Sequence, residues 1–308
     1  MRFLITGAGQ IGSTLAHTLT QAGHEAIVVR RSDAQVPIAT TTISGDAADT
    51  ELLSRAAAGA NAIFHCIHAP YDAKAWRREL PHRERAVLDV AASLGVPVVF
   101  PESVYAFGAA ACDLEEGAPL APVSPLGEVR AELLRARAEH EAVSISVVAS
   151  DLFGAGAGDG SVATVSALRP AVAGKRAWVL ADKDAPHSWT YLPDMAEAMV
   201  HCALNAATLA PNSDVILHAP TAEPVTLREL AKQAAALADT SPARVSEVPV
   251  WVLGAMGPLH PAMRELHAQR YLWRKPAVLR PGRLTREFEL HPTDWATALD
   301  ASVRDICG

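Results

Sequence analysis

The chain has 308 residues and 50% hydrophobic composition, which predicts one large α/β unit or a large domain that carries a smaller one. Its 27 basic and 34 acidic residues give a net charge of -7, so it has no general attraction for a phosphate backbone or an anionic membrane. We therefore expect neither a nucleic-acid partner nor a membrane partner.

The first predicted elements are a strand, "RFLIT" at residues 2–6, and a helix, "IGSTLAHTLTQAG" at residues 11–23. Glycines break the opening apolar run too early for a signal sequence or a spanning helix, so we expect a cytoplasmic protein. Four cysteines are far apart and include no C-x-x-C pair: Cys66, Cys112, Cys202 and Cys307. Buried thiols are expected from this spacing, without a structural metal.

A glycine-rich turn joins this strand to this helix. "TGAGQIG" places Gly7, Gly9 and Gly12 in G-x-G-x-x-G register. Gly7 suits a tight turn, Gly9 admits a pyrophosphate close to the backbone, and Gly12 permits close packing of helix on strand. Gln10 and Ile11 complete the turn, and the helix amides favour the anion. The sequence therefore predicts a dinucleotide-binding site.

The second strand, "EAIVV" at residues 25–29, is followed by Arg30, Arg31 and Ser32. Two guanidiniums and a hydroxyl at this place suit the 2'-phosphate of NADP(H), which we favour over NAD(H). The alternative is that these arginines are surface residues and that Asp33 binds the ribose.

Two later segments add candidate cofactor contacts. "SGDAAD" follows the third strand, and Asp46 with Ala47 is placed to meet the adenine, although an ordinary turn aspartate explains the pattern equally well. The fourth strand, "AIFHC" at residues 62–66, carries His65 and Cys66 and is followed by His68. These side chains line the nucleotide cleft or fill the core, because no third clustered ligand completes a metal site.

Further apolar runs at residues 96–100 and 144–149 alternate with helical segments. This alternation predicts an α/β fold with a Rossmann-type doubly wound parallel sheet. We expect the NADP-binding domain at residues 1–153 and a smaller, mostly helical substrate-binding region at 154–308, parts of which return to the sheet. Its helices are predicted at residues 195–205 and 227–238.

Several motifs together resemble one family: "TGAGQIG", "GDAAD", "VVFPESVYAFG", "SPLGEVR", "SDLFGAG" and "HSWTYLPDMAEAM". Their order and spacing are similar to those of the extended short-chain dehydrogenase/reductases, the epimerase/dehydratase-like branch. The resemblance implies a Rossmann domain, a smaller C-terminal substrate domain and hydride transfer at a nicotinamide.

The chain departs from the pattern of that family at three positions. The family has a Ser or Thr where this chain has Pro101, and a Tyr-x-x-x-Lys pair where it has Leu126 and Arg130. The tyrosine moves the substrate proton, and the lysine lowers its pKa and holds the nicotinamide ribose. Arg130 is expected either to bind the ribose or a phosphate, or to pair with Glu128 or Glu132. Polyketide ketoreductases are the atypical members that the chain resembles most.

Ser103 and Tyr105 are the predicted catalytic residues. They follow the strand at residues 96–100, at the edge where open parallel sheets bind ligands, and they share a side while the chain stays extended. Ser103 would hydrogen-bond a substrate carbonyl, and Tyr105 would supply the proton directly or through water. Packing is the alternative for Tyr105, and Glu102 is a further candidate.

The second half offers weaker candidates. "YLWRK" is a literal Tyr-x-x-x-Lys at residues 271–275, but it stands outside the expected context and is interpreted as a partly exposed helix end. His187 and Tyr191 are placed to reach a substrate pocket. Asp194 with Glu197, and Thr226 with Glu229, are predicted to be helix capping boxes.

The C-terminal half also has an apolar lining, which suits an aromatic substrate better than a nucleotide-sugar: Trp251, Met256, Met263, Tyr271 and Trp273. Core packing explains these residues equally well. The sequence thus favours an NADPH-dependent reductase of a ketone or aldehyde on an apolar, polyketide-like molecule. The alternatives are an epimerase or dehydratase that uses NAD(P) transiently, and a silent NADP-binding sensor or scaffold. The oligomeric state stays open.

Overall fold

The computed structural model describes residues 1–31, 40–180, 182–211, 214–249, 251–252 and 260–308. The chain forms two compact units, each assembled from separate segments. The first unit consists of Met1–Glu102, Val129–Val148 and Met195–Leu217, and the second of Ser103–Glu128, Ala149–Asp194 and His218–Gly308. A single division at residue 153 stays a prediction.

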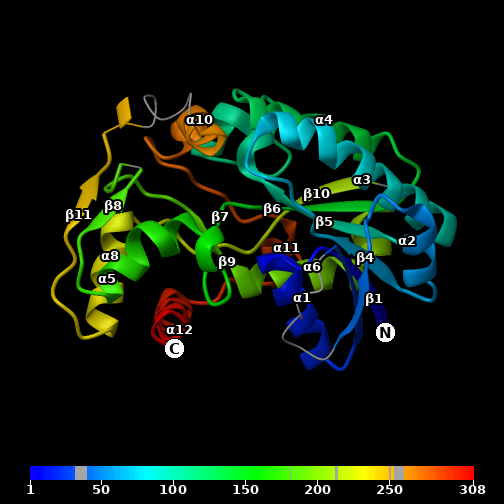
Figure 1. Ribbon diagram of the computed structural model, residues 1–308, viewed down its shortest axis with the longest axis horizontal. Helices are drawn as coiled ribbons and strands as arrows, with labels where there is room; N and C mark the ends of the chain where they lie inside the picture. Colours follow the sequence, from blue (N-terminus) through cyan, green and yellow to red (C-terminus); the bar gives the residue numbers. More distant parts are fainter. Residues whose placement is uncertain (32–39, 181, 212–213, 250, 253–259) are drawn as a thin grey trace. The chain divides into compact units, whose positions relative to one another are not determined.

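A seven-stranded sheet organises the first unit (Figure 1), in the order β10-β6-β5-β4-β1-β2-β3. The strands are β1 (Arg2–Thr6), β2 (Glu25–Arg30), β3 (Thr41–Ser44), β4 (Ala62–His65), β5 (Val98–Ser103), β6 (Ser144–Ala149) and β10 (Asp214–His218). Parallel pairing joins β1 to β2 and β4, β2 to β3, and β4 to β5. The apolar runs of the sequence therefore form the expected parallel sheet.

Helices cover both faces of this sheet: α1 (Gln10–Gln21), α2 (Thr50–Ala56), α3 (Ala73–Leu94), α4 (Pro125–Ala138), α6 (Leu192–Leu204) and α7 (Ala206–Leu209). In Figure 1, α2, α3 and α4 lie on one side of the strands, and α1 and α6 lie on the other. Leu53, Val87 and Ala91 belong to the apolar core between α2, α3 and the sheet. Strands buried on both faces explain why β4 has no polar alternation.

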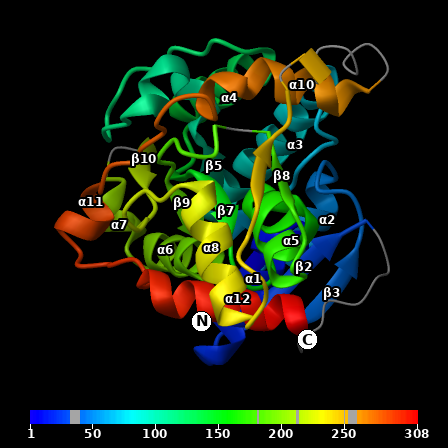
Figure 2. The ribbon, with the colours of Figure 1, turned by 90° about the vertical axis from the view of Figure 1, so that its left-hand side faces the viewer.

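Short strands and helices build the second unit: η1 (Val104–Cys112), β7 (Asp151–Phe153), η2 (Gly158–Gly160), η3 (Thr164–Leu168), α5 (Arg169–Val172), β8 (Ala177–Val179), β9 (Trp189–Tyr191), α8 (Leu227–Leu237), β11 (Val245–Glu247), α10 (Pro261–Ala268), η4 (Gln269–Leu272), α11 (Arg283–Arg286) and α12 (Trp295–Cys307). Strand β7 pairs with β9, and β8 pairs with β11. Figure 2 shows β8 and β11 side by side, with α5 and α8 beside them. Phe153, Trp189 and Leu230 belong to the core of this unit.

Two predictions about helix ends have different outcomes. Thr226 and Glu229 form the expected capping box at the start of α8, which confirms that prediction. The capping box predicted at Asp194 is wrong, because α6 begins at Leu192 and Asp194 lies inside its first turn. The Asp194 carboxylate instead accepts hydrogen bonds from the Thr293 backbone N–H at 2.8 Å and hydroxyl at 2.6 Å.

All four cysteines are free thiols. Cys202 is buried as expected, but Cys307 is exposed because it ends the last helix. In the part of the chain that the structure describes, no helix has both the length and the apolar character needed to cross a membrane. Within the same residues, no three His, Cys, Asp or Glu side chains are grouped to hold a metal ion.

Candidate functional site

The glycine-rich turn between β1 and α1 has a geometry that requires two of its glycines. Gly7 has φ of 92°, a left-handed conformation, and a Cβ there would lie 2.9 Å from the Cys66 carbonyl oxygen. A Cβ on Gly12 would lie 2.0 Å from the Gly7 carbonyl oxygen. The turn can therefore form only with glycine at both positions, since side chains would collide with backbone.

Gly9, unlike Gly7 and Gly12, lies next to open space. It is the N-cap of α1 without a side-chain hydrogen bond, and no described atom lies within 4 Å of a Cβ built on it. The first turn of α1 contains no acidic residue, and its half-buried residues include Gln10 and Ile11. Open space at an uncapped helix N-terminus, where amide donors and the helix dipole meet, fits an anionic group such as a pyrophosphate.

The predicted phosphate-binding arginines follow the second strand. Arg30 is the last residue of β2 and is half-buried, and the next residue, Arg31, is exposed. Ser32 and the alternative ribose ligand Asp33 lie outside the described residues. The structure thus places the two arginines at the carboxyl end of β2, and the preference for NADP(H) stays a prediction.

Asp46 and Ala47 follow β3. The Asp46 carboxylate accepts the Ala48 backbone N–H at 3.0 Å and lies 3.6 Å from Nε of Arg83. This arrangement fits the turn aspartate that the sequence left open. The side chain of Ala47 is buried in the core of the sheet, so only its backbone is placed to meet a ligand.

The histidines and cysteine after β4 differ in their surroundings. His65 is buried, and its Nδ1 lies 2.7 Å from the Thr6 hydroxyl. Burial, helped by the positive charges of Arg137, Arg83 and Arg130, lowers the pKa of His65 to about 3 and keeps the imidazole neutral. Burial likewise raises the pKa of the half-buried Cys66 thiol. Neither group is prepared for acid–base work near neutral pH.

His68 lies close to a tryptophan of α3. The centre of its ring is 4.8 Å from that of Trp76, edge to face, and its Nδ1 is 2.6 Å from the Ala69 carbonyl oxygen. The same Trp76 lies under the guanidinium of Arg130, at 4.7 Å. This tryptophan therefore connects two predicted cofactor residues, which the sequence places far apart.

A buried ion cluster in the first unit was not predicted. Arg137 donates to both oxygens of Glu84 at 2.8 and 2.7 Å and to Glu102 at 3.0 Å. It also donates to the Ser146 hydroxyl at 2.9 Å. One planar fork of donors reaches both carboxylates, which suits Arg better than Lys. Glu102 is thus an ion-pair partner, which argues against its predicted alternative role as a proton donor.

Arg130 joins the same cluster. Its Nε lies 3.5 Å from Glu102, and its side chain is 10% exposed. Its partner in this pair is thus a residue of β5, and the expected partner Glu132 lies 3.6 Å from Arg77. A contact between Arg130 and the nicotinamide ribose stays a prediction.

Ser103 and Tyr105 lie on different kinds of backbone. Ser103 is the last residue of β5, with extended φ and ψ of -106° and 162°, and the chain turns into the 3-10 helix η1 at Val104. The assumption that both side chains point the same way along an extended strand is therefore wrong. Their catalytic roles stay predictions, which now need independent support for each residue.

The start of α4 carries Leu126, the residue predicted to replace the family's tyrosine. Leu126 is completely buried. The Ser124 hydroxyl accepts the Gly127 backbone N–H at 3.1 Å, and a Cβ on Gly127 would lie 2.5 Å from the Tyr105 carbonyl oxygen. The first turn is therefore capped and tightly packed around an apolar side chain.

Tyr271 and Lys275 have separate surroundings. The Tyr271 side chain interacts with Ser124, and burial raises the pKa of its phenol to about 12 despite that interaction. Lys275 is exposed and lines a hollow with His187 and Trp273. Tyr191 packs against Phe153, at 5.5 Å between ring centres, and its place in a substrate pocket stays a prediction.

The chain matches the model of the NAD dependent epimerase/dehydratase family over residues 3–216. It belongs to this family. The match begins within β1 and ends within β10, so it includes the glycine-rich turn, the ion cluster and the start of α4. Among curated proteins, none matches the sequence significantly.

Solved structures of similar fold support this assignment at the level of architecture. UDP-glucose 4-epimerase of Thermotoga maritima with UDP-glucose has a TM-score of 0.74 at 15% identity, covering 100% of this chain and 99% of that one. The Thermus thermophilus UDP-glucose 4-epimerase complex with NAD has a TM-score of 0.74 at 21% identity, covering 100% and 99%. For UDP-N-acetylglucosamine 4-epimerase of Bacillus cereus the values are 0.77 and 12%, covering 100% and 97%. These likenesses confirm the Rossmann-type fold with its C-terminal domain.

Proposed function

We propose that this member of the epimerase/dehydratase family is an NAD(P)-dependent enzyme that oxidises or reduces a carbinol or carbonyl carbon of a small molecule. The observation that carries the proposal is the turn from Gly7 to Gly12, with open space at Gly9 and an uncapped helix N-terminus. This geometry fits the pyrophosphate of a dinucleotide. When bound, the nicotinamide supplies or accepts the hydride.

Residues of the chain would bind the cofactor and orient the substrate. Gly9 and the first amides of α1 would hold the pyrophosphate, and Arg30 with Arg31 would hold a 2'-phosphate, which favours NADP(H). The compared structures from Thermus thermophilus and Bordetella bronchiseptica are complexes with NAD. Our preference for NADP(H) in this chain rests on the two arginines alone. Ser103 would orient the substrate oxygen, and Tyr105 or water would exchange its proton.

Family membership favours the epimerase or dehydratase reading over net ketone reduction. In such reactions the cofactor returns to its starting state within each turnover. The solved structures compared above are UDP-sugar epimerases by their names, but their low identity supports a shared fold and no shared substrate.

Net reduction of a ketone or aldehyde is the second candidate, and the start of α4 favours it. Epimerisation needs a group that takes a proton and returns it, whereas reduction needs one proton delivered once, which water can do. The buried Leu126 cannot exchange a proton, and an arginine side chain does not serve as a proton donor in catalysis. The two candidates therefore differ in a measurable way: epimerisation or dehydration leaves the cofactor unchanged after each turnover, whereas reduction consumes NADPH.

The test starts from purified protein, analysed for copurified NAD(P) by acid extraction and mass spectrometry. UDP-sugars without added cofactor and a panel of ketones with NADPH or NADH are then followed by NMR and by absorbance. Rearranged or dehydrated product without net cofactor change supports the family reaction, and stoichiometric NADPH loss supports reduction. Failure to bind either dinucleotide overturns the proposal, and tight binding without any turnover identifies a silent sensor instead.

A further inference from the structure

Two buried arginines of α4 contact the same carboxylate but differ in how their donors are used. Arg137 has a side chain that is 1% exposed, and it donates to Glu84, Glu102 and Ser146. Arg130 precedes it by about two helical turns, and its side chain is 10% exposed. One arginine therefore has its donors engaged inside the core, whereas the other reaches solvent.

The Arg130 guanidinium is held in place by contacts that do not use its terminal nitrogens. Its central carbon lies 4.7 Å from the centre of the Trp76 ring, and its ion pair with Glu102 is made through Nε at 3.5 Å. Among the described residues, no acceptor is found for a hydrogen bond from this Nε or from the two terminal nitrogens. Stacking and ion pairing thus orient a fork of donors that the described chain leaves unengaged.

Arg130 belongs to the same compact unit as the glycine-rich turn, and a short series of contacts connects the two. A Cβ on Gly7 would lie 3.1 Å from the side chain of Ile67, which His68 follows in the chain. The ring centre of His68 lies 4.8 Å from that of Trp76, the ring on which Arg130 stacks. His68 is exposed, so this part of the unit opens to solvent close to the predicted cofactor.

The chemistry of the Arg130 fork selects the kind of group that it can bind. A guanidinium has donors only, so its partner must supply acceptors, and a carboxylate offers two of them in one plane together with a negative charge. A ribose hydroxyl adds no charge and brings a donor of its own. Glu102 is paired with Arg137 as well as with Arg130, so a second carboxylate would not meet an unpaired negative charge.

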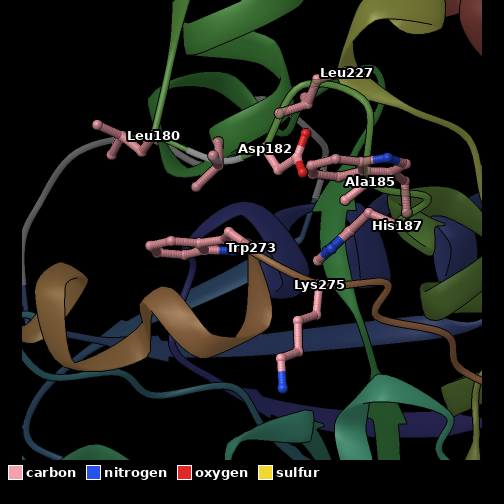
Figure 3. A pocket seen from close by; sticks show the side chains of 9 residues that line it. Leu180, Asp182, Ala185, His187, Leu227, Trp273 and Lys275 are labelled. Atoms are coloured by element: carbon pink, nitrogen blue, oxygen red, sulfur yellow. The ribbon is translucent and has the colours of Figure 1, made fainter. Parts of the chain in front are cut away.

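A hollow in the second unit is too small for a ligand of this kind (Figure 3). Its lining includes His187 and Trp273, and its cavity volume is about 10 Å³, which is room for about one water molecule. Asp151 accepts from Nε2 of His187 at 2.8 Å and from the indole N–H of Trp273 at 3.1 Å. This buried carboxylate holds the two rings in place and disfavours an anion beside them.

We propose that Arg130 binds a carboxylate of the substrate through paired hydrogen bonds from its terminal nitrogens. Glu102 and Trp76 are positioning residues, because they hold the guanidinium in one orientation before the ligand arrives. The substrate is then a small keto acid, which takes a hydride from NADPH and a proton from water to become the hydroxy acid, or the hydroxy acid in the reverse direction. The inference rests on the proposed function, since it names the substrate class of that enzyme.

Direct binding tests the inference without any turnover. Ligand-observed NMR titrations on the whole protein compare 2-oxobutyrate with its methyl ester, which lacks the carboxylate charge, first without cofactor and then with saturating NADPH. We expect the acid to bind at least about tenfold tighter than the ester in both conditions, as one charge-assisted pair of hydrogen bonds allows. Equal affinities of acid and ester would overturn the inference.

Three variants locate the anion. Arg130→Gln removes the fork and should abolish the preference for the acid, whereas Arg130→Lys keeps the charge without the fork and should retain only part of it. Arg135→Gln, at an exposed arginine of the same helix, should keep the full preference. A full preference in Arg130→Gln, or in Arg130→Lys, would contradict the paired hydrogen bonds. Thermal unfolding of each variant shows whether a lost affinity reflects an unfolded protein.

A parallel titration with NADPH, followed by its fluorescence, distinguishes a substrate carboxylate from a phosphate of the dinucleotide. Displacement of 2-oxobutyrate by NADPH, or an equal loss of both affinities in Arg130→Gln, would assign the guanidinium to the cofactor and overturn the inference. If NADPH binds and the acid has no advantage over the ester, the inference fails and the proposed function stands. If the acid binds through Arg130 and no dinucleotide binds, the proposed function fails and the anion site stands.

Discussion

The Arg130 guanidinium lies between the Glu102 carboxylate, 3.5 Å from its Nε, and the ring of Trp76, 4.7 Å from its central carbon. We predict from the sequence pattern that Arg130 replaces the family's lysine and Leu126 replaces its tyrosine. The ion pair with Glu102 and the stacking on Trp76 hold the Arg130 side chain in place. Leu126 is held by close packing, because its side chain is completely buried.

A tyrosine introduced at position 126 should destabilise the fold. We expect Leu126→Tyr to lower the free energy of unfolding by about 1–3 kcal/mol, because a larger, polar ring must enter a completely buried site. Leu237→Tyr, at a leucine that is 48% exposed, is the matched control and should change little. Thermal or urea unfolding measures both. An unchanged stability in Leu126→Tyr would show that the site has room for the phenol.

The buried ion cluster should make Arg137 one of the residues most important for stability. Arg137→Met leaves Glu84 and Glu102 buried with too little positive charge, which we expect to cost about 3–5 kcal/mol in urea unfolding at pH 7. Arg55→Met breaks an exposed i,i+4 pair with Glu51 and should cost no more than about 0.5 kcal/mol. Similar losses in the two variants would contradict the role assigned to the cluster.

His65 should make stability depend on pH in a defined window. The folded protein holds its pKa at about 3, below the ordinary value of 6.5, so between these values the unfolded chain binds the extra proton and stability falls as pH falls. From pH 7 to pH 5 the expected contribution is about 2 kcal/mol. His65→Gln should reduce the loss between these pH values, whereas His17→Gln, at an exposed histidine of α1, should not. Equal losses in all three proteins would exclude a buried neutral His65.

Two glycines of the turn should respond differently to substitution by alanine, one in stability and the other in NADPH binding. Gly12→Ala forces a Cβ to within 2.0 Å of backbone and should lower the unfolding temperature by several degrees. Gly9→Ala meets no described atom, so the fold should stay intact while NADPH affinity falls about tenfold or more, as expected if the pyrophosphate approaches this residue. Unimpaired NADPH binding by Gly9→Ala would argue against the predicted position of the pyrophosphate.

Cofactor choice can be tested at the end of β2. Replacing Arg30 and Arg31 by alanine should weaken NADPH by about 10- to 100-fold, the value of one charge-assisted contact, and NADH by much less. Fluorescence titration with both dinucleotides gives the ratio. An equal loss for NADPH and NADH would refute the phosphate role of the arginines.

Local rules explain which features the sequence could predict. The glycine turn, the apolar strands and the Thr226 capping box each depend on residues close together in the chain, and the structure has them where they were expected. The pairing of Arg137 with Glu84 joins residues of two helices, and Glu102 adds a residue of β5. No periodicity within one element reveals such partners, because charged residues on a helix usually face solvent.

The features that the sequence predicted wrongly, or did not predict, also depend on contacts between distant parts of the chain. Asp194 matches a capping motif, but it is engaged by Thr293, a partner from a distant part of the sequence. Ser103 and Tyr105 were assigned to one face because the strand was assumed to continue, whereas η1 begins between them. The hollow around Trp273 depends on Asp151, whose two hydrogen bonds connect residues from three separate segments. Tertiary contacts decide each of these cases.

The interleaved composition of the two units affects how the protein can be made and changed. Neither unit is one continuous stretch of chain, and the first includes Met195–Leu217, which is translated after most of its other strands. The first sheet can therefore complete its edge only after β10, at Asp214–His218, has left the ribosome. Exchanging either unit as a gene cassette would require several coordinated splices, so new substrate specificities in this scaffold should arise through point substitutions within the segments.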